Sequence, residues 1–185
     1  MESTSNSVQT PAENSFVSKF VAYIFDRCAK DRGTAARLRR ADNPATEYQS
    51  WDVLATFGID IEKEYVRLPF ATIAAAIAKS RAEHDGPVSL GEAIASCFEG
   101  ERESTAAQAR LRRLLACSAV PEVCRMLRGT LALIESKSAS KLCYSRLLSQ
   151  LKSFHFDDQR IKSQWAAEFY KTRPGKDETV GGDEC

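Results

Sequence analysis

Residues 109–134, ARLRRLLACSAVPEVCRMLRGTLALI, decide the fold, because their apolar residues recur at helical spacing on both sides of a short connection. A helix turns about 100° per residue, so residues three and four apart share one face and pack inward together. The two inner faces consist of Leu111, Leu114 and Leu115 in the first helix and of Val123, Leu127, Leu131 and Ile134 in the second. The stretch therefore predicts a pair of packed helices.

Helical spacing continues towards the N-terminus. Apolar residues recur from Phe16 to Ile24, and Ser15 is a suitable N-cap for that helix. We expect Gly33 to end it and a short basic helix to follow over residues 34–41. Residues 1–14 are rich in Ser, Thr and Asn and are expected to form a disordered lead-in.

Start signals divide the rest of the chain into further helices. Asn43 and Pro44 supply an N-cap and a first helical residue, and Pro69 is expected to begin another helix. Ser89 and Glu92 fit a capping box, in which each side chain binds a backbone N–H of the first turn. Further helices are predicted at residues 105–118, 121–136, 141–154 and 158–171.

Strand signals are nearly absent. No stretch alternates apolar and polar residues for long, and runs of β-branched residues are missing. The chain is therefore expected to be all-α, with about eight to nine helices in two small bundles packed together. We assign residues 15–100 to an N-terminal bundle, residues 101–173 to a basic C-terminal bundle and residues 174–185 to a mobile acidic tail.

Charge is distributed unevenly along the chain, although the formal net charge is only +1. Residues 104–173 hold thirteen Lys and Arg residues against five Asp and Glu residues. Residues 61–103 and 174–185 are net acidic. A basic segment of this kind favours a polyanionic partner.

Several classes of function lack their motifs. The sequence has no GxGxxG, GxSxG or HExxH motif and no CxxC spacing. Its two histidines, His84 and His155, are not at ligand spacing from a cysteine pair, so we expect no metal site, no cofactor and no catalytic site. The cysteines are expected to be small, mostly buried residues in a reducing compartment.

Membrane and secretory signals are also missing. No apolar run is long enough to cross a bilayer, and the N-terminus lacks a basic region followed by an apolar stretch. We therefore expect a cytoplasmic protein without membrane contact.

Arginines occupy the outer faces of the basic helices. Residues three apart on a helix lie about 60° apart, so they are presented to solvent together. If the two helices of residues 109–134 pack antiparallel, four such groups line one groove. Guanidinium groups bind phosphate oxygens through two hydrogen bonds, so these clusters predict contact with a nucleic-acid backbone more than base readout. The clusters are Arg110, Arg113, Arg125 and Arg128 in that pair and Arg37, Arg39 and Arg40 around Leu38.

Five motifs follow one another in a specific order. They are SLGEAIAS (89–96), RLRRLLAC (110–117), LRGTL (127–131), KLCYSRLLSQLKSF (141–154) and RIKSQWAAEFY (160–170). Together they resemble the CasB family, the small subunit of the type I-E CRISPR surveillance complex Cascade. The resemblance covers residues 16–172, with better agreement after Ser89.

The resemblance implies a function and a set of site residues. It implies a non-catalytic helical subunit, present as two copies, that contacts other Cascade subunits, CRISPR RNA and target DNA. Such a subunit would stabilise the R-loop and the displaced strand. The basic positions of the family correspond to Arg40 with Arg39 beside it, to Arg110 and Arg128, and to Arg160 and Lys162. Arg37, Arg113 and Arg125 rest on the helical-face argument alone.

Two other functions stay open. The first is a helical protein–protein scaffold whose arginines only meet acidic surfaces of its partners, and it predicts no retention on nucleic acid at low salt. The second is a helical hydrolase or transferase of unrecognised type, which a bound metal or nucleotide after purification would indicate.

Overall fold

The computed structural model describes residues 11–80, 82–137 and 141–171. Within these ranges it contains nine α-helices, two short 3-10 helices and no β-strand, which confirms the all-α prediction. The α-helices are α1 (Pro11–Lys30), α2 (Arg32–Arg40), α3 (Trp51–Thr56), α4 (Glu64–Lys79), α5 (Leu90–Ser96), α6 (Thr105–Leu115), α7 (Val120–Lys137), α8 (Tyr144–Phe154) and α9 (Asp158–Tyr170), and the 3-10 helices are η1 (Pro44–Ser50) and η2 (Glu101–Glu103).

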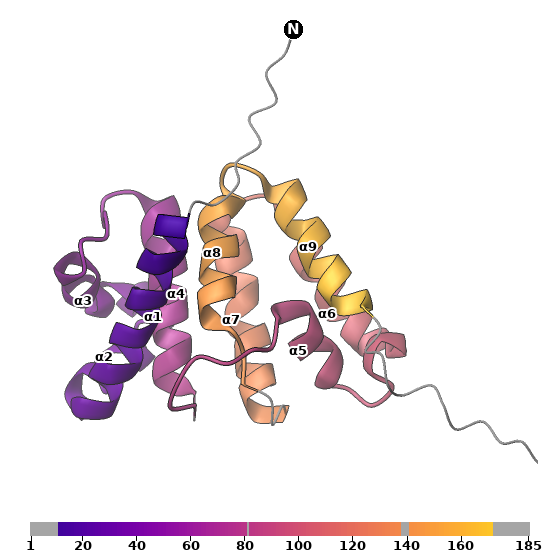
Figure 1. Ribbon diagram of the computed structural model, residues 1–185, viewed down its shortest axis with the longest axis horizontal. Coiled ribbons are helices and arrows are strands. Elements are labelled where there is room, and N and C mark those ends of the chain that lie inside the picture. Colours follow the sequence, from indigo (N-terminus) through magenta and orange to yellow (C-terminus); the bar gives the residue numbers. More distant parts are fainter. Residues whose placement is uncertain (1–10, 81, 138–140, 172–185) are drawn as a thin grey trace, which may run out of the picture.

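Helix α4 lies at the centre of the packing (Figure 1). Helices α1, α2 and α3 contact it from one side and α7 and α8 from the other, while α5, α6 and α9 extend beyond α7 and α8. Nearly every residue of α4 from Leu68 to Ala78 is buried, because neighbouring helices cover it all round. The buried side chains form one continuous core.

Helix α5 packs mainly against α9 and α6. Gly91 makes this possible, because a Cβ at this position would lie 2.5 Å from both the backbone nitrogen of Phe169 and the carbonyl oxygen of Trp165. Only a residue without a side chain lets two backbones approach this closely. Helix α5 therefore groups with helices that follow it in the sequence, and the division into two bundles after residue 100 stays a prediction.

The segment before α5 lies against the segment before α8. Val88 and Leu142 form an isolated parallel bridge. The backbone N–H of Val88 donates to the carbonyl oxygen of Lys141 at 3.2 Å, and that of Cys143 donates to the carbonyl oxygen of Val88 at 2.8 Å. Residues 141–143 are engaged in this pairing, so the helix predicted from residue 141 begins at Tyr144 instead.

Asp85 caps α8 from this segment. Its carboxylate accepts hydrogen bonds from the backbone N–H groups of Tyr144, at 2.6 Å, and Ser145, at 3.2 Å. A carboxylate also interacts favourably with the positive end of a helix. The turn after α4 thus fixes where α8 starts, although the two are almost sixty residues apart in the sequence.

Of the two predicted proline starts, one is confirmed and one is wrong. Pro44 follows Asn43, whose side-chain oxygen accepts a 3.0 Å hydrogen bond from the N–H of Ala45. Pro69 does not begin a helix, because α4 starts five residues earlier, at Glu64. Leu68 and Pro69 are both buried. Core packing therefore keeps the first turn helical although proline lacks one N–H group.

The capping box predicted at α5 is wrong in the part assigned to Ser89. Ser89 stands at the N-cap, but its side chain makes no capping hydrogen bond. The N–H of Gly91 donates instead to Oε2 of Glu168 in α9, at 3.3 Å. A tertiary contact has replaced the local cap.

Helices α1 and α2 also meet at a different residue from the one predicted. Helix α1 begins at Pro11, ahead of Ser15, and the break falls at Asp31. The Asp31 carboxylate caps α2 by accepting from the N–H groups of Gly33, at 2.8 Å, and Thr34, at 3.2 Å. Residues 1–10 and the predicted acidic tail, residues 174–185, lie outside the described residues.

Candidate nucleic-acid interface

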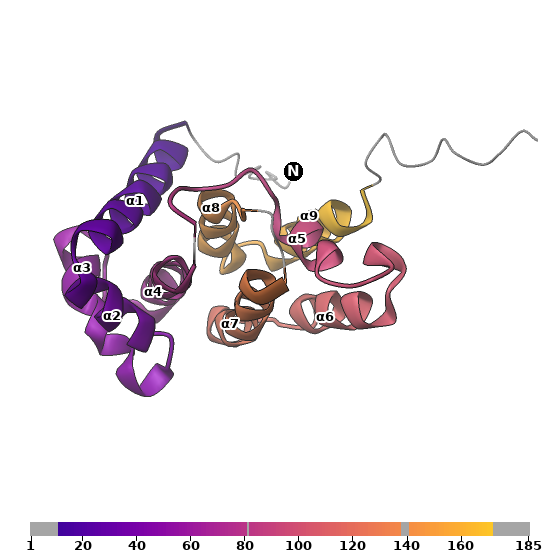
Figure 2. The ribbon, with the colours of Figure 1, turned by 90° about the horizontal axis from the view of Figure 1, so that it is seen from below.

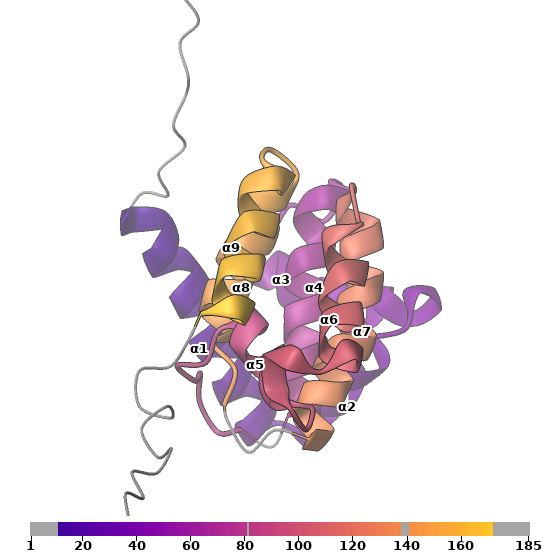
Figure 3. The ribbon, with the colours of Figure 1, turned by 90° about the vertical axis from the view of Figure 1, so that its right-hand side faces the viewer.

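Helices from both halves of the sequence line one side of the molecule. Figure 2 shows α2, α4, α7 and α6 following one another, with α1, α8 and α9 on the opposite side. Figure 3 shows α2, α7 and α6 on the same side again. These three helices carry seven of the nine predicted basic residues.

Arg110 reaches from α6 to α7. Its Nη1 atom lies 3.9 Å from the position that a Cβ would take on Gly129. This is an ordinary van der Waals distance, so the guanidinium group lies against α7 at the residue that follows Arg128.

Asp42 connects Arg128 to α4. The Nε atom of Arg128 lies 3.8 Å from Oδ1 of Asp42, and the ammonium group of Lys79 forms a short hydrogen bond with Oδ2. The Arg128 side chain is only 12% exposed, and its Nε has no hydrogen-bond partner within the described part of the chain. Arg128 and Lys79 thus share the carboxylate of Asp42.

Arg39 joins the C-terminal end of α2 to that of α4. Its Nε donates a 2.6 Å hydrogen bond to the carbonyl oxygen of Ala78, in the last turn of α4. Carbonyl groups at a helix C-terminus carry partial negative charge, so they attract such cations. Arg40 follows Arg39 and is exposed. We call Arg39, Arg40, Lys79, Arg110 and Arg128 the basic ridge.

Arg113 and Arg125 extend the basic ridge towards the turn between α6 and α7. Arg113 follows Arg110 by three residues, Arg125 precedes Arg128 by three, and both side chains are exposed. Residues three apart share a helix face. Arg128 is only 12% exposed, so it does not lie on the outer face expected from the helical spacing, and the shared groove and role of these four arginines stay a prediction.

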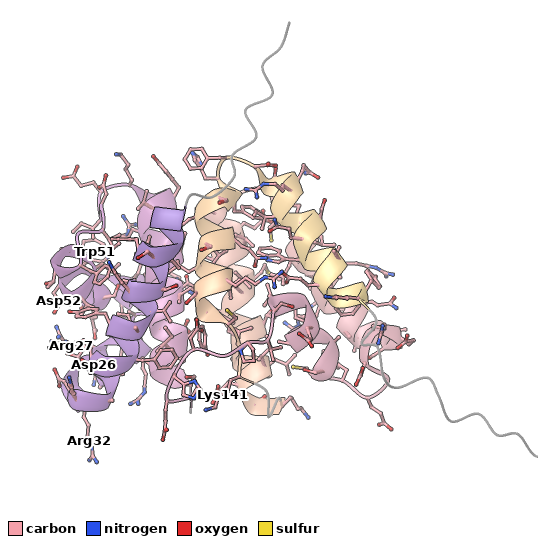
Figure 4. All side chains as sticks on the ribbon, viewed as in Figure 1. Asp26, Arg27, Arg32, Trp51, Asp52 and Lys141 are labelled. Atoms are coloured by element: carbon pink, nitrogen blue, oxygen red, sulfur yellow. The ribbon has the colours of Figure 1, made fainter. Side chains whose placement is uncertain are left out.

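Arg37 is paired elsewhere. Its Nη1 lies 2.5 Å from Oδ2 of Asp52, and its Nη2 donates to the hydroxyl oxygen of Thr34 at 3.2 Å. Figure 4 places Asp52 at the outer edge of the molecule, on the far side from α6 and α7. Arg37 therefore belongs to the contact between α2 and α3 and not to the basic ridge.

The two basic residues of α9 are paired within their own helix. Arg160 Nε lies 3.0 Å from Oδ2 of Asp157, and Lys162 Nζ lies 2.7 Å from Oδ2 of Asp158. The Lys162 ammonium also lies over the ring of Phe154, 5.8 Å from its centroid. Neither residue lies on α2, α4, α6 or α7. The family resemblance groups Arg160 and Lys162 with the other basic positions, whereas the packing puts them on a separate helix.

Lys79 and Asp42 belong to the candidate site although the sequence argument did not select them. Lys79 stands in the last turn of α4, and Asp42 lies just beyond α2. No local pattern marks either residue, because their meeting depends on how α2 and α4 pack. The sequence indicates only that Lys79 stands near the end of a helix.

Burial keeps several cysteine thiols of the core protonated. Burial raises the pKa of the Cys124 thiol to about 12, and desolvation also raises the pKa values of Cys97 and Cys117. Protonated thiols are poor nucleophiles. Within the described ranges no group of three or more His, Cys, Asp and Glu side chains could hold a metal ion. Among the helices of these ranges none is long and apolar enough to cross a membrane.

The described residues form an all-helical protein in which α2, α6 and α7, on one side, carry seven of the nine predicted basic residues. The chain belongs to the family of the CRISPR-associated protein Cse2, whose family model matches residues 34–170. This match confirms the resemblance inferred from the five motifs. No curated protein sequence matches the chain.

Solved structures share the fold. The chain is similar to CasB from Thermobifida fusca, with 19% identity and a TM-score of 0.61 over 86% of this chain and 98% of that one. It is similar to M. ruber CasB, with 22% identity and a TM-score of 0.67 over 84% and 92%. It also resembles a chain of a CRISPR RNA-guided surveillance complex, with 17% identity and a TM-score of 0.69 over 87% and 93%. At these identities the likeness concerns the fold alone.

Proposed function

We propose that the chain is a non-catalytic small subunit of a type I-E Cascade ribonucleoprotein. Its basic ridge binds the phosphate backbone of nucleic acid and stabilises the R-loop that guide RNA and target DNA form, together with the displaced strand. Its partners are the other Cascade subunits, CRISPR RNA, target DNA and a second copy of the chain, in the cytoplasm. Membership of the Cse2 family and the fold shared with a chain of a CRISPR RNA-guided surveillance complex support this proposal.

The observation that carries the proposal is the contrast between two sets of basic side chains. Arg37, Arg160 and Lys162 each have a carboxylate oxygen within 3.0 Å. In the basic ridge, by contrast, Lys79 and Arg128 share one carboxylate, that of Asp42, and Arg40 is exposed. Cations that outnumber their carboxylates are suited to a polyanion, whereas cations paired one to one are suited to holding helices together.

The energetics of an R-loop suit a subunit that contacts only the backbone. An RNA–DNA duplex is about as stable as the DNA duplex that it replaces, so R-loop formation is nearly balanced. A few additional phosphate contacts are enough to shift such an equilibrium. Base pairing with the guide reads the sequence, so arginine and lysine side chains suffice on the protein.

The test is target-DNA binding by a reconstituted guide-RNA complex that contains either the wild-type chain or a variant with Arg40, Arg110 and Arg128 all changed to Ala. We expect weaker R-loop retention in an intact complex. We also expect the slope of log affinity against log salt to be shallower by about 2–3, because each phosphate contact contributes roughly 0.7–0.9. Mass photometry would confirm that assembly is unchanged.

A matched control removes the same charge from the paired set. A variant with Arg37, Arg160 and Lys162 changed to Ala also loses three cations, but we expect it to keep the wild-type salt slope. An equal effect of both variants would assign the result to net charge and not to the basic ridge. Unchanged DNA binding by the assembled ridge variant would contradict the proposal and favour a protein–protein scaffold.

A further inference from the structure

A cavity of about 280 Å³ opens beside the basic ridge, between α4 and α7. Its inner end is formed by Tyr144 and Leu131, whose side chains are buried. Its rim includes Ala132 and Ser136, which are exposed. Pockets for drug-sized ligands measure roughly 300–1,000 Å³, so this one suits a smaller molecule.

The charged lining of the cavity is balanced. Lys79 and Arg128 contribute two positive charges, and Asp42 and Glu135 contribute two negative charges. A phosphate group would meet both carboxylates, so it is disfavoured inside. A purely apolar molecule would remove water from four charged groups without replacing its hydrogen bonds, which is costly.

The remaining walls are partly apolar and partly hydroxylic. Ala76, Leu131 and Ala132 provide aliphatic surface, and Tyr144 provides a hydroxyl group. A tyrosine hydroxyl is protonated at neutral pH and can both donate and accept a hydrogen bond. The lining as a whole fits an uncharged molecule with apolar faces and a polar edge. Nucleobases have this chemistry.

We propose that the cavity takes one nucleobase of the strand whose phosphates follow the basic ridge. The proposal rests on the proposed function, because it assigns a base-binding subsite to the same surface. Lys79 and Arg128 belong both to the ridge and to the cavity wall. A strand whose phosphates follow the ridge therefore passes the mouth of the cavity.

The test compares two single-stranded 12-mers with the full chain at low salt, by fluorescence anisotropy. One is oligothymidine, and the other has the same phosphates but no bases. We expect the wild-type chain to bind oligothymidine about tenfold more tightly, within the range that single base contacts contribute in other proteins. Because the abasic strand has phosphates but no bases, its affinity measures binding to the basic ridge alone.

A variant locates the base preference. Ala132→Leu adds bulk at the rim of the cavity without removing a charge, and the residue is exposed, so the helix tolerates the change. We expect this variant to lose the preference for oligothymidine while it binds the abasic strand as the wild type does. Ala167→Leu, at an exposed position on α9, is the matched control and keeps the preference. Thermal unfolding of both variants confirms that they are folded.

Each other outcome is informative. Equal wild-type affinity for the two strands overturns the base subsite and leaves the ridge intact. A preference that survives in Ala132→Leu places base recognition elsewhere and also overturns it. Stabilisation by free thymidine without any strand preference would assign the cavity to a free nucleoside. Binding of neither strand counts against the basic ridge itself, and thus against the proposed function.

Discussion

The indole Nε1 of Trp165 donates a 2.8 Å hydrogen bond to the side-chain oxygen of Gln150, and both side chains are buried between α8 and α9. The Gln150 amide nitrogen donates in turn to Glu168, at 2.9 Å, and Arg146 lies 2.7 Å from the same carboxylate oxygen. Three buried polar groups are thus satisfied in one chain of contacts. These contacts fix how α9 lies on the core.

Replacing Gln150 by Met keeps the side-chain length but removes both hydrogen bonds. The Trp165 N–H is then buried without an acceptor, and we expect the free energy of unfolding to fall by about 1–3 kcal/mol. Urea titration followed by circular dichroism measures this. Gln159→Met, at an exposed position of α9, is the control and should have little effect. Equal losses would show that the buried network contributes nothing of its own.

Two glycines should respond to alanine in opposite directions. At Gly91 a Cβ would lie 2.5 Å from backbone atoms of α9, which cannot move aside, so Gly91→Ala should cost about 3 kcal/mol, at the upper end for overpacking. At Gly129 the nearest atom is the flexible end of Arg110, at 3.9 Å. Gly129→Ala should therefore stabilise α7 by about 0.5–1 kcal/mol. Thermal unfolding of both variants would contradict this if the shifts had the same sign.

Acid should weaken the cap of α2. Hydrogen bonds from the Thr34 side chain, the Thr34 N–H and the Gly33 N–H lower the pKa of Asp31 below its ordinary value of 3.8. A lowered pKa in the folded state means that the contribution to stability is complete above about pH 4 and is lost as the pH falls through the folded value. Asp31→Ser keeps a capping oxygen that does not titrate.

Comparing the wild type with Asp31→Ser tests whether the cap of α2 depends on ionisation of Asp31. The difference in unfolding free energy between the wild type and Asp31→Ser should be constant near neutral pH and should shrink below about pH 4. Urea titrations across that range measure it. A difference that stays constant into strong acid would show that the cap does not depend on ionisation.

Thiol labelling should separate Cys124 from Cys28. Cys124 is 1% exposed, and burial raises its pKa to about 12, so the native chain offers no thiolate there at neutral pH. Desolvation also raises the pKa of Cys28, but this residue is only half-buried and its thiol is more accessible. With iodoacetamide and peptide mapping by mass spectrometry, we expect Cys28 to be labelled in the native chain and Cys124 only in urea. Similar native rates at the two cysteines would contradict the packing of α7 against α4.

The sequence predicts the helices best where apolar spacing is strong. The leucine face of α6, the inner stripe of α7 and the start of α9 at Asp158 lie as expected. These features depend on neighbours within one or two turns of the same helix. Helix starts that depend on contacts with other helices were predicted less well. Helix α4 begins before Pro69 and keeps this proline inside it, and the carboxylate of Glu168 caps α5 where the Ser89 side chain was expected to do so.

In the candidate site, too, the sequence predicts what depends on one helix and misses what depends on the packing of several. Helical spacing was enough to group Arg110 with Arg113 and Arg125 with Arg128, but it could not tell which cations pair with carboxylates of the same chain. The partner of Arg37 is fifteen residues away, and Lys79 reaches Asp42 across thirty-seven residues. Such distances along the chain carry no periodic signal, so these assignments needed the packed molecule.

The close approach of α5 to α9 has a consequence for synthesis of the protein. Gly91 and its contact Trp165 are separated by about seventy-five residues, so α9 leaves the ribosome well after α5. At translation rates of roughly 5–20 residues per second, the apolar face of α5 stays uncovered for about 4–15 s. The nascent chain thus exposes an apolar helix face that a chaperone can recognise, and this face is buried only after α9 has been made.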